Sequence, residues 1–174
     1  MKKLTIGLLI ASAFLVGIVT NVFVNSNKTS KISQTVSESV LDLPFLIENG
    51  DEISINEIEF NDKLIVNFWA SWCEPCKKEI PELNNFNKGL NKNNTRLIGV
   101  AIDEMNEVLS FTKEIPLTYT NLTDEQNGFL LSRYFGNEKG VLPFTVLVDK
   151  NFQVLHKFFG EITEKDLQKV IKNQ

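Results

Sequence analysis

Cysteine and histidine are scarce in this chain, and their scarcity excludes several classes of protein. Two cysteines among 174 residues cannot build the disulfide framework of a small secreted domain. A structural zinc site normally takes four protein ligands, and the chain offers these two cysteines and one histidine, His156. We therefore expect no resident metal and no cofactor, and we expect His156 to be a half-buried strand residue.

Basic tracts are missing as well. The chain has 18 Lys and Arg against 22 Asp and Glu, for a net charge of −4, and no stretch interleaves basic with aromatic residues. Nucleic acid is therefore not an expected partner. The apolar fraction is 43%, with 13 Phe, which suits one globular domain plus an appendage.

The N-terminal segment has the composition of a membrane anchor. Residues Leu4 to Val24 carry no charge, and about 20 apolar residues suffice to span a bilayer. A cleaved signal peptide is the alternative, but the one small-x-small site, Ala11-Ser12-Ala13, lies in the middle of the apolar stretch. We expect residues 1–24 to be an uncleaved single-pass anchor. Lys2 and Lys3 before it favour a domain facing the periplasm or the cell exterior.

A polar linker separates this segment from the folded domain. Residues Asn25 to Ser39 are mostly Ser, Asn, Thr and Lys, a composition that cannot bury a core. We assign 25–40 to a flexible linker and 41–174 to one domain.

Strand and helix patterns alternate along that domain. Continuous apolar runs indicate buried strands, and apolar residues at helical spacing indicate helices. The expected strands are a hairpin within Leu43–Ile55, then Lys63–Ser71, Arg96–Asp103, Phe144–Asp149 and Phe152–Gly160. The expected helices begin near Cys73, Asn106, Asn127 and Thr163, with Thr163 as an N-cap. This order predicts an α/β domain with a mixed central sheet flanked by helices.

The two cysteines, Cys73 and Cys76, follow a buried strand and open a helix. Free backbone N–H groups at a helix N-terminus stabilise a thiolate, so we expect Cys73 at the first exposed position to be the reactive group. Cys76 lies one turn along on the same face, within disulfide range. Pro75 falls in the first helical turn, where its missing N–H costs nothing. A purely structural disulfide across four residues would restrict the unfolded chain little, so the pattern favours thiol–disulfide exchange.

Two segments resemble the thioredoxin superfamily. "VNFWASWCEPCKKEIPEL" resembles its active-site segment, and "GVLPFTVLVD" resembles its proline loop and the strand after it. The resemblance covers roughly Leu41 to Asn173 and implies a thioredoxin-like fold. Within the superfamily, the N-terminal anchor and the Glu-Pro pair between the cysteines resemble features of the membrane-tethered TlpA/ResA/CcmG-type branch. That branch carries extra secondary structure in the segment Met105 to Gly140.

The resemblance also implies roles for individual residues. Cys73 would attack and Cys76 would resolve the mixed disulfide, so the pair would form the redox-active disulfide. The residues implied to bind the substrate are Trp72, Glu74, Pro75, Leu142 and Pro143. Pro143 corresponds to the family's cis-proline, although an ordinary trans proline opening a strand is the alternative. Pro81 matches a helix-kinking proline.

One position departs from the thioredoxin pattern. Where thioredoxins have a buried Asp six residues before the first cysteine, this chain has Asn67, which cannot titrate. Glu79 lies three residues beyond Cys76 on the same helical face, and a glutamate there is characteristic of the branch. We expect Glu79 to accept the proton of the resolving thiol. The alternative is a solvated helix carboxylate.

Three functions are compatible with these motifs. The first is reduction of protein disulfides outside the membrane, for example in apocytochrome c, with a membrane thiol reductant as electron donor. The second is a peroxidase on the same fold, which would need Thr where the chain has Ala70. The third is a copper-handling module, in which the cysteines are usually spaced by three residues rather than two. We expect the first.

Overall fold

The computed structural model describes residues 40–90 and 94–172. All of these residues belong to one compact unit, which begins at Val40. The expected anchor, 1–24, and all of the expected linker except Val40 lie outside the described residues. No helix in the described part is both long enough and apolar enough to cross a bilayer.

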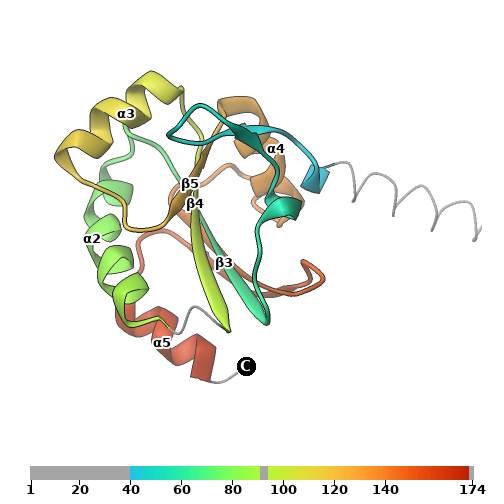
Figure 1. Ribbon diagram of the computed structural model, residues 1–174. Helices are drawn as coiled ribbons and strands as arrows, with labels where there is room; N and C mark the ends of the chain where they lie inside the picture. The colour runs from blue at the N-terminus through green and yellow to red at the C-terminus, as the bar shows by residue number, and fades with distance from the viewer. Residues whose placement is uncertain (1–39, 91–93, 173–174) are drawn as a thin grey trace, which may run out of the picture. The chain divides into compact units, whose positions relative to one another are not determined.

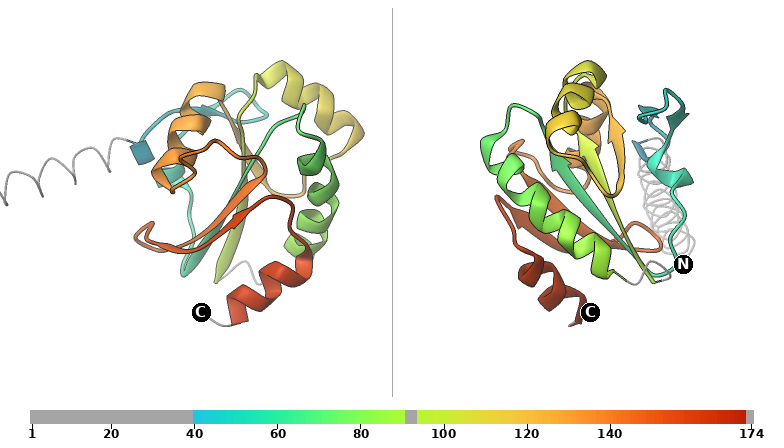
Figure 2. Two further views of the ribbon diagram at one scale, coloured as in Figure 1. Left: turned by 180° about the vertical axis from the view of Figure 1, so that it is seen from behind. Right: turned by 60° about the vertical axis from the view of Figure 1, so that its left-hand side comes forward.

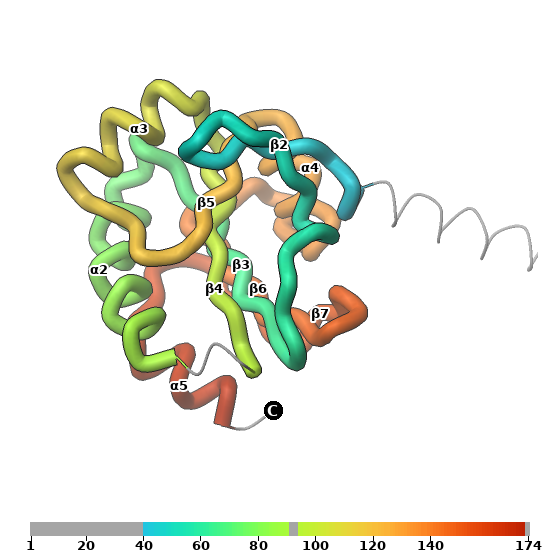
Figure 3. Tube along the Cα trace, in the orientation of Figure 1, coloured from blue at the N-terminus to red at the C-terminus, as the bar shows by residue number. Residues whose placement is uncertain are grey.

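The described unit is built on one mixed sheet of seven strands in the order β2-β1-β5-β4-β3-β6-β7 (Figures 1 and 3). Strands β3, β4 and β5 run parallel, whereas β6 and β1 join them antiparallel. The strand bounds are β1 Phe45–Leu46, β2 Glu52–Ile53, β3 Lys63–Trp69, β4 Thr95–Ala101, β5 Thr120–Thr123, β6 Phe144–Asp149 and β7 Val154–Phe159. The expected α/β fold with a mixed sheet is confirmed.

Helices cover both faces of the sheet (Figure 2). Their bounds are η1 Ile55–Glu57, α2 Glu74–Gly89, α3 Met105–Glu114, α4 Glu125–Tyr134 and α5 Glu164–Lys172. Alternate residues of β3 serve the two faces, as the pleat requires. Val66 and Phe68 pack in the cluster that includes α4, while Ile65 and Trp69 face α2, α3 and α5.

The sequence patterns predicted most of these elements but missed β5. This strand reads Thr-Asn-Leu-Thr, and only its last two residues are buried, so it carries no apolar run. It lies between α3 and α4 in the segment expected to hold extra structure, and it pairs with both β4 and β1. The N-terminal hairpin is confirmed, with Gly50 at φ 89° in its turn.

The C-terminal helix begins as expected. The Thr163 hydroxyl donates to Asp166 Oδ2 at 2.6 Å, and the Thr163 N–H donates to the same oxygen at 2.9 Å. Aspartate thus fills the position that Glu or Gln takes in the usual capping box. The cap also fixes the end of the loop before α5, and Ile162 of that loop contacts Glu79 of α2.

Candidate active site

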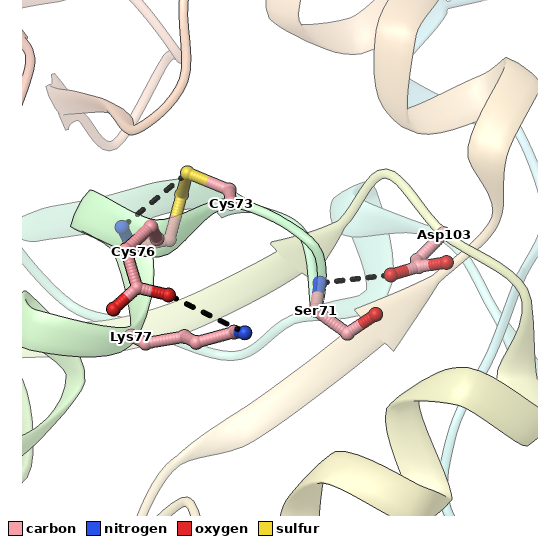
Figure 4. Close-up of polar contacts among 6 residues, drawn as sticks. Ser71, Cys73, Cys76, Lys77 and Asp103 are labelled. Carbon is pink, nitrogen blue, oxygen red and sulfur yellow. Dashed lines mark hydrogen bonds and ion pairs between the residues drawn. A yellow bond between two sulfur atoms is a disulfide. The ribbon is translucent and has the colours of Figure 1, made fainter.

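Cys73 and Cys76 lie where β3 passes into α2, and they form a disulfide with a Cα–Cα distance of 5.2 Å (Figure 4). Cys73 is the N-cap of α2, and its sulfur accepts a hydrogen bond from the Cys76 N–H at 3.3 Å. In the dithiol the same amide can donate to a thiolate at Cys73, and the positive end of the helix dipole favours that charge.

The cysteines are more buried than the sequence suggested. Cys73 is 5% exposed and Cys76 is fully buried, so the expectation of an exposed position for Cys73 is wrong for the oxidised protein. The reason is packing, because both sulfurs join an apolar cluster with Trp69 and Ile80. Trp72, the residue before Cys73, is by contrast 67% exposed.

A buried carboxylate holds the loop that leads to Cys73. Asp103, at the end of β4, accepts a hydrogen bond from the Ser71 N–H at 2.8 Å (Figure 4). Its other oxygen accepts from the Glu104 N–H at 3.0 Å. The sequence analysis missed Asp103, because its partner lies 32 positions away in the chain.

The charged side chains in the first turn of α2 reach solvent. Glu74 pairs with Lys77 at 3.6 Å on the first turn of α2, and its side chain is 69% exposed. Pro75 occupies the first helical turn, as predicted. Pro81 lies inside α2.

The proline loop lies against the same apolar cluster as the cysteines. The Leu142–Pro143 peptide bond is cis, which confirms the isomer expected from the resemblance. Leu142 packs against the cluster that contains both cysteines. The buried Asn137 side chain donates to the Val141 carbonyl at 2.9 Å and accepts from the Val141 N–H at 3.0 Å, which fixes the approach to the loop.

Glu79, three residues beyond Cys76 in α2, is fully buried, so its alternative reading as a solvated carboxylate is wrong. Its Oε1 accepts a hydrogen bond from Asn67 Nδ2 at 2.7 Å, and its Oε2 accepts from the Ile162 N–H at 3.2 Å. Burial raises the pKa of Glu79 from 4.5 to about 7, against the opposing effect of these two hydrogen bonds. The charge of Glu161 adds a smaller increase. A carboxyl with a pKa near neutrality can both take and release a proton under physiological conditions.

Asn67 therefore does more than replace a titrating residue. Its amide nitrogen also donates to Thr145 Oγ1 at 2.9 Å, so β3, β6 and α2 share one polar network. Neither Thr145 nor Ile162 could be found from spacing, because they lie 78 and 83 positions from their partners. His156 is half-buried on β7 against Phe158, as expected, and takes no part in this network.

The model of the AhpC/TSA family matches residues 36–167. The chain belongs to this family. The match covers both cysteines, Glu79 and the proline loop, so the site described above lies within the family's domain.

Individual relatives are consistent with this assignment. A curated relative, the thiol-disulfide oxidoreductase ResA of Geobacillus kaustophilus, is 27% identical over 146 residues, which is 83% of this chain and 81% of that protein. A thioredoxin-related protein from Neisseria meningitidis serogroup B is 31% identical, with a TM-score of 0.64 over 72% of this chain and 93% of that one. StoA from Bacillus subtilis is 26% identical, with a TM-score of 0.58 over 76% of this chain and 98% of its own.

Proposed function

We propose that this protein is a thiol–disulfide oxidoreductase that reduces protein disulfides through Cys73 and Cys76. The observation that carries the proposal is the Cys73–Cys76 disulfide at the N-terminus of α2, with a buried carboxyl three residues beyond Cys76. The relative from Geobacillus kaustophilus, named a thiol-disulfide oxidoreductase, supports the same chemistry.

The reaction balances as two successive exchanges. The Cys73 thiolate attacks one sulfur of the substrate disulfide, forms a mixed disulfide and releases the first substrate thiolate, which takes up a proton. The Cys76 thiol then loses its proton and attacks Cys73 Sγ, which releases the second substrate thiolate. Two electrons pass from the dithiol to the substrate, and the protein is left with the disulfide that the structure contains.

Glu79 is the proposed acceptor for the Cys76 proton. Cys76 is fully buried, so bulk water does not reach its sulfur in the oxidised protein. Glu79 is buried on the same face of α2, and its pKa of about 7 places a large fraction of it in the carboxylate form at neutral pH. Asn67 donates to that carboxylate and keeps it in place.

The substrate would dock across the exposed rim of the disulfide. Trp72 provides an exposed apolar contact, while Glu74 and Pro75 border the sulfurs on the helix side. Leu142 and Pro143 face them from the proline loop, where backbone groups can pair with an extended substrate segment. We propose that these five residues bind the polypeptide around the target disulfide.

We place this activity outside the cytoplasm. The uncharged segment Leu4–Val24 supports a membrane anchor, and residues 25–40 would tether the domain to it. A membrane thiol reductant would then restore the dithiol. Apocytochrome c before haem attachment is the proposed substrate class, and the resemblance to the TlpA/ResA/CcmG-type branch supports it.

A peroxidase is the weaker candidate. The position that would carry the required Thr is Ala70, which is fully buried and offers no hydroxyl. We therefore expect the dithiol to reduce a protein disulfide and to leave peroxide unconsumed.

The experiment is turnover of insulin disulfides by the reduced protein with dithiothreitol as the electron source. Wild type should accelerate insulin precipitation, Cys73→Ala should not, and Cys76→Ala should accumulate a mixed disulfide with the substrate.

The same assay tests the role of Glu79. Glu79→Gln should slow exchange on the order of 10–100-fold, the lower part of the range for a positioned acid–base group. Glu82→Gln, the same change one turn along α2, is the matched control and should retain the wild-type rate. Peroxide consumption without insulin reduction would contradict the proposal.

A further inference from the structure

Two buried polar atoms near Glu79 have no hydrogen-bond partner within the described residues. They are Asn67 Oδ1 and the Tyr119 hydroxyl. Buried polar atoms are paired in the great majority of cases, with protein or with ordered water, so an orphaned pair marks a contact that remains to be completed. Tyr119 precedes β5, the strand that the sequence patterns missed.

Gly99 connects the two residues, because it pairs with Asn67 in the sheet and lies next to the Tyr119 ring. In the β3–β4 ladder Gly99 lies opposite Asn67, so both positions face α2. A Cβ built on Gly99 would lie 3.2 Å from Cε2 of the Tyr119 ring and 2.5 Å from Asn121 Oδ1. The tyrosine ring thus lies over Gly99, the register partner of Asn67, in space that a side chain at position 99 would enter.

Tyr119 is also close enough to sense the charge of Glu79. Burial raises the pKa of the Tyr119 hydroxyl, and the Glu79 carboxylate raises it further. The hydroxyl therefore stays protonated and can act as a hydrogen-bond donor. The other groups that face Glu79 are the Asn67 amide from β3, the Ile162 N–H from the loop before α5 and the charge of Glu161.

We propose that Tyr119 is a positioning residue for Glu79, acting through an internal water that links its hydroxyl to Asn67 Oδ1. The hydroxyl donates to the water, and the water donates to Asn67 Oδ1. This arrangement fixes the Asn67 amide with Nδ2 toward Glu79 Oε1, the orientation that stabilises the carboxylate. The inference rests on the role proposed above for Glu79.

The consequence of losing the hydroxyl follows from the chemistry of the amide. Without a donor on its Oδ1 side, Asn67 can rotate and present that oxygen to Glu79. Oδ1 accepts a hydrogen bond from the protonated carboxyl but repels the carboxylate. Tyr119→Phe should therefore raise the pKa of Glu79 by roughly 0.5–1 pH unit, a modest shift for the loss of one favourable hydrogen bond.

The test is a titration of the Glu79 carboxyl by carbon-13 NMR in the oxidised protein, where neither cysteine titrates. The Glu79 signal is assigned by its loss in Glu79→Gln. Tyr119→Phe should raise the pKa of Glu79. Tyr134→Phe should leave it unchanged, because Tyr134 is the other tyrosine of the chain and packs against the opposite face of the sheet. An unchanged Glu79 titration in Tyr119→Phe would overturn the inference.

A second variant tests the route through Asn67. In an Asn67→Ala background, the further change Tyr119→Phe should leave the pKa of Glu79 where Asn67→Ala alone puts it. The amide that couples the two residues is absent from that background. A full shift in that background would show that Tyr119 acts directly on Glu79 and would contradict the proposed link. The titration uses no substrate, so a failure of this inference is distinguishable from a failure of the disulfide reductase activity.

Discussion

At the scale of single residues, the central feature is a carboxyl group buried where its ionised form opposes folding. Glu79 is fully buried, accepts hydrogen bonds from two donors and has no cationic partner among the described residues. Burying a carboxylate opposes folding unless the charge is compensated, so its pKa rises instead. An apolar residue at this position would give a more stable fold. The observed choice fits a group that is kept for proton transfer.

The pH dependence of stability follows with a definite sign. The folded protein keeps a proton on Glu79 between pH 4.5, its ordinary pKa, and about 7, whereas the unfolded chain has already released it. Glu79 should therefore lower the free energy of unfolding as pH rises through this window, by at most about 3 kcal/mol. Urea unfolding of the oxidised protein from pH 4 to 8 measures this change, and Glu79→Gln removes it. Parallel stability curves for the two proteins would contradict the assignment.

At the scale of elements, the site is built where three connections meet. The β3–α2 connection ends at Cys73, the loop before β6 carries the cis-proline, and the loop before α5 supplies the Ile162 N–H to Glu79. The first connection is held by a side chain 32 positions away, whereas the second is held by one only four positions away. Asp103 holds the first and Asn137 holds the second.

Removing Asp103 should loosen the first of these loops. Asp103→Ala leaves the Ser71 and Glu104 N–H groups without their acceptor, at a cost of about 1–3 kcal/mol. Asp103→Asn retains one acceptor oxygen and should recover part of that loss. Urea unfolding gives the stability, and hydrogen exchange at the Ser71 amide shows whether the loss is local. Equal protection of that amide in wild type and Asp103→Ala would refute the role of this contact.

The same scale shows why the sequence predicted some parts of the site and missed others. The strand before Cys73 and the helix after it are marked by local patterns: an apolar run, a proline in the first turn and helical spacing from Ile80 onward. The position of Glu79 on the cysteine face follows from the same spacing. Its burial does not, because it depends on Asn67 and on Ile162, which reaches it across 83 positions. Tyr119 carried no signal, because it lies just before β5, a strand that is short and mostly polar.

At the scale of the whole molecule, two parts with different physical characters share one chain. The described domain has a buried apolar core and many charged residues, whereas residues 4–24 carry no charge. In the proposed arrangement the anchor confines the redox site to a thin layer at the membrane surface. A membrane reductant would then meet it at a high effective concentration.

Cell fractionation tests the tether. Full-length protein should sediment with membranes at its unprocessed mass, and a chain that begins at Asn25 should be found in the soluble fraction. A soluble product of the full-length gene that begins near residue 25 would show that the segment is a removed signal peptide.

The reduction potential of the Cys73–Cys76 couple tests the reductase proposal most directly. Carboxylates at Glu74 and Glu79 oppose thiolate formation and so destabilise the reduced form relative to the disulfide. Equilibration of the domain with glutathione or dithiothreitol buffers, followed by thiol counting, gives the potential. We predict a value nearer to the about −270 mV of thioredoxin than to the about −120 mV of DsbA. A value above roughly −180 mV would contradict the account and indicate an oxidase or isomerase instead.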